Sequence, residues 1–254
     1  MKIILNIATH GDERLGFKVA KEIKKFNINK NILRVQIANK KAFKLHKRFI
    51  DQDLNRSLPG GKNGNYEERL AYKLSPFIRS ADIIIDVHST TSELKDTIIV
   101  TRLDERVLKY LKIIKPKYVL IMTVTENSAL ISQAKIGIAF EYGKDRSSLA
   151  TQKTVTGIKR IFKHLGIIDL NIPKSNIVTK YFDVTSAVHK PKGYRLLKKI
   201  KNLKIIKKGN IYATNGNDYL TAKEDFYPAL FGEKTYKYIF GFSAKKLKIN
   251  NKKP

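Results

Sequence analysis

The stretch MKIILNIATHGDE, residues 1–13, sets the fold prediction because an aliphatic run ends in polar side chains. Residues 2–8 predict a buried β-strand, and residues 14–26 repeat apolar side chains at helical spacing. Gly11 would let the backbone bend tightly between the two elements. In α/β domains ligands bind at the carboxyl ends of such strands. This turn is therefore the first candidate site.

The alternation of strand and helix signals continues to residue 164. Further strands are predicted at 32–38, 83–87, 97–101, 118–123 and 136–141, and further helices at 65–78, 107–114 and 147–164. Asn65 followed by Glu68 is typical of a capping box. Strands separated by helices predict an α/β sheet with helices on both faces.

The pattern changes after Gly166. Residues 171–173 read as a linker, and short β-like runs follow at 177–184, 203–206 and 211–214 with turn residues between them. We therefore predict one large domain over residues 1–166 and a small, mostly β domain over residues 175–254.

Composition limits the chemistry. Hydrophobic residues make up 42% of the chain, enough for a real core, and there is no cysteine, which excludes disulfides and thiolate metal sites. A metal would have to be held by His, Asp or Glu, and there are only five histidines.

No apolar run approaches the roughly 20 residues of a membrane span. We expect a cytoplasmic protein with no membrane contact.

The formal net charge is +29. A polyanion partner such as nucleic acid would explain it. However, only 11 of the 51 basic residues are Arg, the preferred bidentate ligand of phosphate, and the Lys excess accompanies many Ile and Asn. Compositional bias is the favoured explanation, so nucleic acid would bind only through non-specific charge. The sequence leaves a homo-oligomer open.

Polar residues at two strand ends form a potential zinc site. His10 and Glu13 share the first turn, and His88 ends the strand at 83–87. Together they make the His₂Glu set of a catalytic zinc. Asp86, two residues before His88, would point the same way and could accept its second imidazole N–H. An ordinary polar turn and a packed core histidine would show the same residues.

Two further segments carry charge. Glu141 closes an apolar strand, where a carboxylate needs a partner or a role, so a salt bridge and a general base are both open. Residues 48–56 (RFIDQDLNR) contain Arg48, Asn55 and Arg56, suited to carboxylate binding, although plain surface charge is the alternative.

In order and wording these segments resemble the succinylglutamate desuccinylase and aspartoacylase family of zinc carboxypeptidase-like proteins. Residues 9–13 (THGDE) and 86–92 (DVHSTTS) are similar to its metal motifs, 51–56 (DQDLNR) to its Asp-x-Asp-Leu-Asn-Arg motif, and 140–143 (FEYG) to its catalytic glutamate segment. Residues 226–236 (FYPALFGEKTY) resemble its C-terminal Tyr-Pro motif, which would make Tyr236 a substrate-facing side chain. The resemblance implies a mixed sheet flanked by helices and a zinc hydrolase domain over 1–166.

One departure concerns specificity. Family members that recognise an acidic side chain carry an extra arginine and tyrosine upstream of the catalytic glutamate, and residues 127–134 contain neither.

The resemblance and the residue chemistry together predict a zinc-dependent amide hydrolase with one Zn²⁺ per chain. His10, Glu13 and His88 would hold the metal, Glu141 would be the general base, and Arg48 would stabilise the oxyanion. Asn55, Arg56 and Tyr236 would bind the carboxylate of a small anionic N-acyl amino acid, such as an N-acetyl-aspartate- or N-succinyl-glutamate-like substrate. The alternatives are a zinc carboxypeptidase acting on short peptides and a nucleic-acid-binding protein that has lost catalysis.

Overall fold

A computed structural model describes residues 1–90, 94–233 and 236–249 of the chain. Within these ranges a nine-stranded mixed sheet runs in the order β11-β12-β7-β5-β4-β6-β3-β1-β2, and a second sheet has the order β10-β9-β8. In the described ranges no helix is long and apolar enough to cross a membrane.

The first part of the chain supplies the centre of the sheet. Its strands are β1 (Ile3–Ile7), β2 (Leu33–Ile37), β3 (Ile83–His88), β4 (Thr97–Val100), β5 (Tyr118–Ile121) and β6 (Ile136–Glu141). Its helices are α1 (Leu15–Lys24), α2 (Lys40–Lys44), α3 (Tyr66–Arg79), α4 (Glu105–Ile114) and α5 (Ser148–His164), with 3₁₀ turns η1 (Leu54–Arg56), η2 (Thr123–Thr125) and η3 (Leu130–Gln133). The predicted mixed sheet flanked by helices is confirmed.

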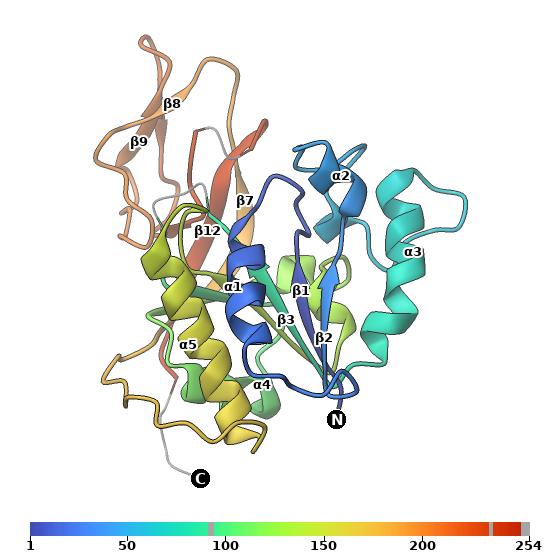
Figure 1. The fold of residues 1–254 in the computed structure, drawn as a ribbon. Helices are drawn as coiled ribbons and strands as arrows, with labels where there is room; N and C mark the ends of the chain where they lie inside the picture. The colour runs from blue at the N-terminus through green and yellow to red at the C-terminus, as the bar shows by residue number, and fades with distance from the viewer. Residues whose placement is uncertain (91–93, 234–235, 250–254) are drawn as a thin grey trace.

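Both faces of the sheet are buried, and alternate residues of each strand serve different cores. Ile3 and Leu5 join the core under α1, α4 and α5, whereas Ile4 joins the one under α3 and η3. In Figure 1 the helices α1 and α5 lie together on one side and α3 on the other. On β3, Asp86 and His88 share the alternation of Ile84, so they belong to the α3 face at the carboxyl end of the strand.

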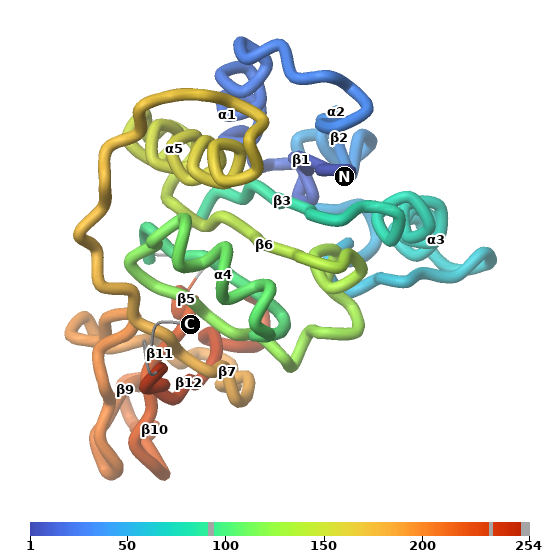
Figure 2. Tube along the Cα trace, turned by 90° about the horizontal axis from the view of Figure 1, so that it is seen from below, coloured from blue at the N-terminus to red at the C-terminus, as the bar shows by residue number. Residues whose placement is uncertain are grey.

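The C-terminal part is rich in β-structure, but it is divided between the two sheets. The strands β7 (Lys180–His189), β11 (Tyr227–Ala229) and β12 (Ile239–Leu247) extend the central sheet, with β7 parallel to β5. The second sheet contains β8 (Arg195–Leu196), β9 (Ile211–Thr214) and β10 (Tyr219–Thr221), and it stands at one end of the molecule (Figures 1 and 2). Residues 203–206, predicted as a strand, contribute only the bridge from Ile206 to Phe226.

Candidate functional site

The turn between β1 and α1 is fixed from three directions. A Cβ on Gly11 would lie 2.2 Å from the carbonyl carbon of Ala42, so only glycine fits here. The Gly11 N–H donates to Arg48 O at 3.0 Å. The Asp145 carboxylate accepts from the backbone N–H groups of Arg14 and Leu15 at 2.8 and 2.9 Å and so caps α1. The side chains of this turn are therefore held in place before any ligand binds.

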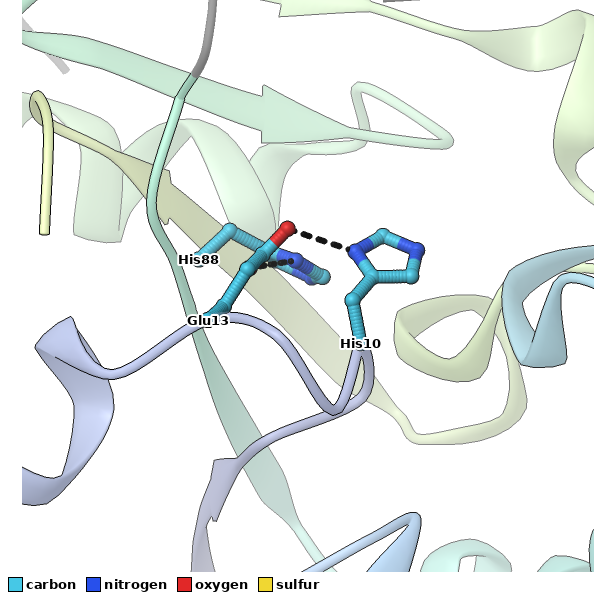
Figure 3. A group of neighbouring side chains, drawn as sticks. All are labelled: His10, Glu13 and His88. Atoms are coloured by element: carbon cyan, nitrogen blue, oxygen red, sulfur yellow. Dashed lines mark hydrogen bonds and ion pairs between the residues drawn. The ribbon is translucent and has the colours of Figure 1, made fainter. Parts of the chain in front are cut away.

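Three side chains converge at this edge of the sheet (Figure 3). His10 Nδ1 lies 2.7 Å from Glu13 Oε1, and His88 Nδ1 lies 3.0 Å from Glu13 Oε2. The three ligand atoms lie within 4.8 Å of one another, and all three residues are buried. This arrangement brings together the two imidazoles and the carboxylate of a His₂Glu site.

The other nitrogen of each imidazole faces a second carboxylate. His10 Nε2 lies 3.0 Å from Asp53 Oδ1, and His88 Nε2 lies 2.8 Å from Asp86 Oδ2. Carboxylates in this position fix the tautomer of a metal-binding histidine and leave its opposite nitrogen free for the ion. Both histidines are therefore oriented with Nδ1 towards Glu13.

The hydrogen-bond chemistry of His88 fits a bound cation. Both ring nitrogens face carboxylate oxygens, but a neutral imidazole has only one N–H to donate. A cation between Nδ1 and Glu13 would resolve this conflict, with the single N–H donated to Asp86. Burial alone lowers the pKa of His88, but the charges of Asp86 and Glu13 raise it well above the usual value. The negative charge of these two carboxylates therefore favours a positive charge at this position, which either a second proton on His88 or a divalent ion would supply.

Asp86 is itself anchored by neutral polar groups on β1 and in the turn after it. Its Oδ1 accepts from Asn6 Nδ2 at 2.7 Å and from Thr9 Oγ1 at 2.9 Å. All three side chains are buried. Since these donors leave Asp86 little freedom to move, the contact between Asp86 and His88 Nε2 fixes the orientation of the imidazole.

Arg48 and Asp53 sit on the loop after α2. Arg48 Nη1 lies 3.5 Å from Glu13 Oε1, and Nη2 lies 3.4 Å from Asp53 Oδ2. Nη2 also lies 3.0 Å from His10 Nε2. Because a guanidinium can only donate, a His10 that gives its Nε2–H to Asp53 cannot also accept from Arg48. The Arg48 guanidinium is thus held by Glu13 and Asp53 at the edge of the cluster of His10, Glu13 and His88.

A buried carboxylate from α3 shapes this loop. Glu67 has no exposed surface, and its oxygens accept from the backbone N–H groups of Ile50, Asp51 and Gln52 at 2.7, 2.9 and 3.3 Å. The Asn39 amide donates to it as well, at 2.9 Å. Glu67 therefore sets the path of the chain between Arg48 and Asp53.

Glu141 lies beside the cluster of His10, Glu13 and His88, on the strand next to β3. It pairs in register with His88 where β6 runs parallel to β3. Burial raises the pKa of Glu141 to about 7, against the opposing charge of His88. A carboxyl group with this pKa can take up and release a proton near neutral pH.

The remaining predicted residues line the same pocket. Asn55 Oδ1 accepts from the Leu130 N–H at 3.0 Å, which ties η1 to η3. Arg56 is exposed at the pocket and donates to the Asn55 carbonyl at 2.8 Å. Burial raises the pKa of Tyr236 to about 12, so its phenol stays protonated. The C-terminal part of the chain thus reaches the site through Tyr236.

One pocket, with a volume of about 80 Å³, joins these groups. It is lined by the predicted residues His10, Arg48, Asn55, Arg56, His88, Glu141 and Tyr236, by the carboxylates Asp53 and Asp86, and by neutral side chains from β4, β6, the segments after β5 and Leu230.

A comparison with protein families identifies the chain. The model of the succinylglutamate desuccinylase/aspartoacylase catalytic domain matches residues 1–165. The chain belongs to this family.

Named relatives and solved structures agree with the family. The chain is 30% identical to a probable aspartoacylase from Nostoc sp. over 208 residues, which are 72% of this chain and 71% of that protein. It is 25% identical to an N-acyl-aromatic-L-amino acid amidohydrolase (carboxylate-forming) from Xenopus laevis, over 74% and 70% of the two chains. The crystal structure of murine aminoacylase 3 superposes with a TM-score of 0.78, at 17% identity over 97% and 95% of the chains. The predicted family and fold are confirmed.

Sequence reasoning placed the family motifs but missed part of their surroundings. It named Asp86 as the partner of His88, as the structure shows, but not Asp53 as the partner of His10, although the quoted DQDLNR segment contains it. Glu67 carried no signal beyond its place near a helix N-terminus. Thr91, Ser92, Lys234 and Thr235 of the quoted motifs lie outside the described residues.

Proposed function

We propose that this protein is a zinc-dependent hydrolase that cleaves the amide bond of an N-acyl amino acid. One observation carries the proposal: the Nδ1 atoms of His10 and His88 face the Glu13 carboxylate, while Asp53 and Asp86 hold their Nε2 atoms. This arrangement supports the proposal because two histidines and a glutamate, with carboxylates behind the histidines, are a usual donor set for a catalytic zinc ion. Membership of a family that includes named amidohydrolases supports the reaction class.

His10, Glu13 and His88 would hold the ion, one per chain. When bound, zinc would supply Lewis acidity to a water molecule and to the scissile carbonyl. The protein supplies the remaining steps of the reaction through its own side chains.

Glu141 would act as the base and then as the acid. Its carboxylate takes a proton from the water that attacks the amide carbon. The C–N bond then breaks, and the Glu141 Oε passes that proton to the nitrogen of the leaving amine. A pKa of about 7 suits both transfers, because neither the protonated nor the ionised form is strongly favoured near neutral pH.

Arg48 and Arg56 would each stabilise a different negative charge, Arg48 the oxyanion and Arg56 the substrate carboxylate. Arg48, next to the metal cluster, would donate to the carbonyl oxygen as it gains charge. Arg56, with Asn55 and Tyr236, would bind the α-carboxylate and hold the amide in place. Leu230 and Tyr236 line the pocket from the C-terminal part, which favours a single amino acid over a peptide threaded through an open groove.

The test is amide hydrolysis by the purified protein, followed by ninhydrin detection of the released amine from a panel of N-acetyl amino acids. We expect turnover that a chelator removes and that one equivalent of zinc restores. A protein that binds one zinc ion, remains folded and releases no amine from any member of the panel would overturn the proposal. Salt-sensitive RNA binding without zinc would favour the alternative nucleic-acid reading.

A further inference from the structure

One wall of the pocket is apolar and lies where two cores of the protein meet. Ala129 and Ile131 belong to the core under α3, while Met122 and Leu230 belong to the core formed by β5, β7 and β12. Ile99 packs against both cores. Ile131 and Met122 are each only 4% exposed, so the wall is a fixed surface rather than a set of mobile side chains.

The cations of the pocket are nearly all committed to other groups. Among the described lining residues the only cations besides the histidines are Arg48 and Arg56. Arg48 pairs with Glu13 and Asp53. Arg56 forms no ion pair with any residue in the described ranges, and its guanidinium donates to the backbone carbonyl of Asn55. Among the described lining residues, Arg56 is therefore the one cation without an ion pair, which matches one substrate carboxylate.

A nearby arginine is directed away from the pocket. Arg102 follows the pocket residue Thr101, but its guanidinium donates to the backbone carbonyls of Ser132, Ala134 and Lys135. Arg102 therefore stabilises the end of η3 and does not add a charge to the wall.

A second carboxylate on the substrate would find no unpaired cation among these described lining residues. It would face the apolar wall, the neutral hydroxyl groups of Thr101 and Thr125, or the acids Asp53, Asp86 and Glu141. Against the wall it would lose its water without gaining a hydrogen bond, and beside the acids it would be repelled.

From this arrangement, and resting on the proposed function, we propose that the substrate carries a single carboxylate and an uncharged, apolar side chain that lies against the wall of Ile99, Met122, Ala129, Ile131 and Leu230. The proposal departs from the expectation of an N-acetyl-aspartate- or N-succinyl-glutamate-like substrate. The lack of charge on these five wall residues, more than their shape, would select an apolar substrate side chain over a charged one.

The first experiment compares two substrates of nearly the same shape. In N-acetyl-L-leucine and N-acetyl-L-aspartate the branched end of the side chain is either two methyl groups or a carboxylate. We expect kcat/KM of the zinc-loaded enzyme to favour the leucine compound at least about a hundred-fold, the effect of a buried charge without a partner. Equal or faster cleavage of the aspartate compound, or of N-acetyl-L-ornithine with its cationic side chain, would overturn the proposal.

The second experiment places a cation on the wall. Ile131→Arg, and Met122→Arg as a second site, should lower the leucine-to-aspartate ratio of kcat/KM at least about tenfold, because a buried carboxylate then gains a partner. Ile131→Met is the matched control, since it keeps the wall apolar and should keep the ratio. A ratio unchanged in every folded Arg variant would show that the wall does not contact the side chain.

Binding separates this proposal from the proposed function. Glu141→Gln protein, loaded with zinc, allows calorimetric titration with both compounds in the absence of turnover. If the wild type cleaves no member of the N-acetyl amino acid panel, the proposed function fails, but tighter binding of the leucine compound still supports an apolar pocket. Tighter binding of the aspartate compound overturns the pocket assignment whether or not hydrolysis is found.

Discussion

The two sides of the pocket are built in different ways. On one side, His10, Glu13 and His88 are held by directional contacts to one another and to the carboxylates of Asp53 and Asp86. The apolar wall, represented by Ile131 and Met122, has side chains that belong to hydrophobic cores. A hydrogen-bonded network loses its function when one member changes, whereas an apolar wall tolerates substitutions of similar volume. In this fold, chemistry and specificity can therefore change independently.

The largest expected effect comes from removing a metal ligand. His88→Ala should reduce bound zinc from about one ion per chain to nearly none, because three protein ligands are usual for a catalytic site. Elemental analysis of the purified protein and amide hydrolysis measure the two losses. His189→Ala, which changes an exposed histidine on β7, should alter neither. Full zinc content in His88→Ala would remove this histidine from the metal site.

A smaller loss is expected when the base is neutralised. Glu141→Gln should retain zinc and the fold but lower kcat by about 10²- to 10⁴-fold, the usual contribution of a positioned general base. The comparison with His88→Ala is informative because only one of the two variants should lose the metal. Near-normal turnover by Glu141→Gln would place the base elsewhere in the pocket.

Arginine variants should separate binding from chemistry. Arg56→Ala should lower kcat/KM by about ten- to a hundred-fold, because a hydrogen bond to a charged group contributes roughly 1.5 to 3 kcal/mol. Arg56→Lys should recover little of this, since an ammonium group lacks the two-pronged geometry. Arg48→Ala should act mainly on kcat. Rates for the free acid and its methyl ester measure carboxylate recognition directly. Equal wild-type rates would contradict it.

The smallest effect on catalysis is expected from the loop support. Glu67→Gln replaces a carboxylate oxygen with a donor that faces backbone N–H groups, so the free energy of unfolding should fall by about 1 to 3 kcal/mol. We expect kcat to fall about tenfold or less as Arg48 shifts. Denaturant unfolding and steady-state kinetics measure these changes. Glu68→Gln, next to it in the capping box of α3, is the control and should leave kcat unchanged; a matching loss of kcat there would refute this role for Glu67.

Local sequence patterns were enough to predict many of the strands and helices. The apolar run before His10, the Asn65 and Glu68 capping pair, and the strand ending at Glu141 each reflect short-range chemistry, and each has its expected place in the structure. The two-residue spacing of Asp86 and His88 correctly gave their contact, because alternate residues of a strand share a face.

Contacts between distant segments could not be predicted in this way. Gly11 was expected to allow a tight bend. The structure shows that this position needs glycine for lack of space, because the backbone at Ala42 passes too close for any side chain. Asp53 reaches His10 only because the loop after α2 folds back over the turn. The β-rich C-terminal part gave no sign that β7 would extend the central sheet beside β5. The boundary predicted between residues 166 and 175 stays a prediction.

The cap that Asp145 places on α1 has a consequence for how the protein acquires its fold. This carboxylate closes the turn of His10 and Glu13 from 131 residues further along the chain. Contacts of such sequence separation form late, because a long loop must first be closed. We therefore expect the ion to bind a frame that has already folded, and refolding rates with and without zinc to be alike. In this protein the metal would bind after the chain has folded and would not start the folding reaction.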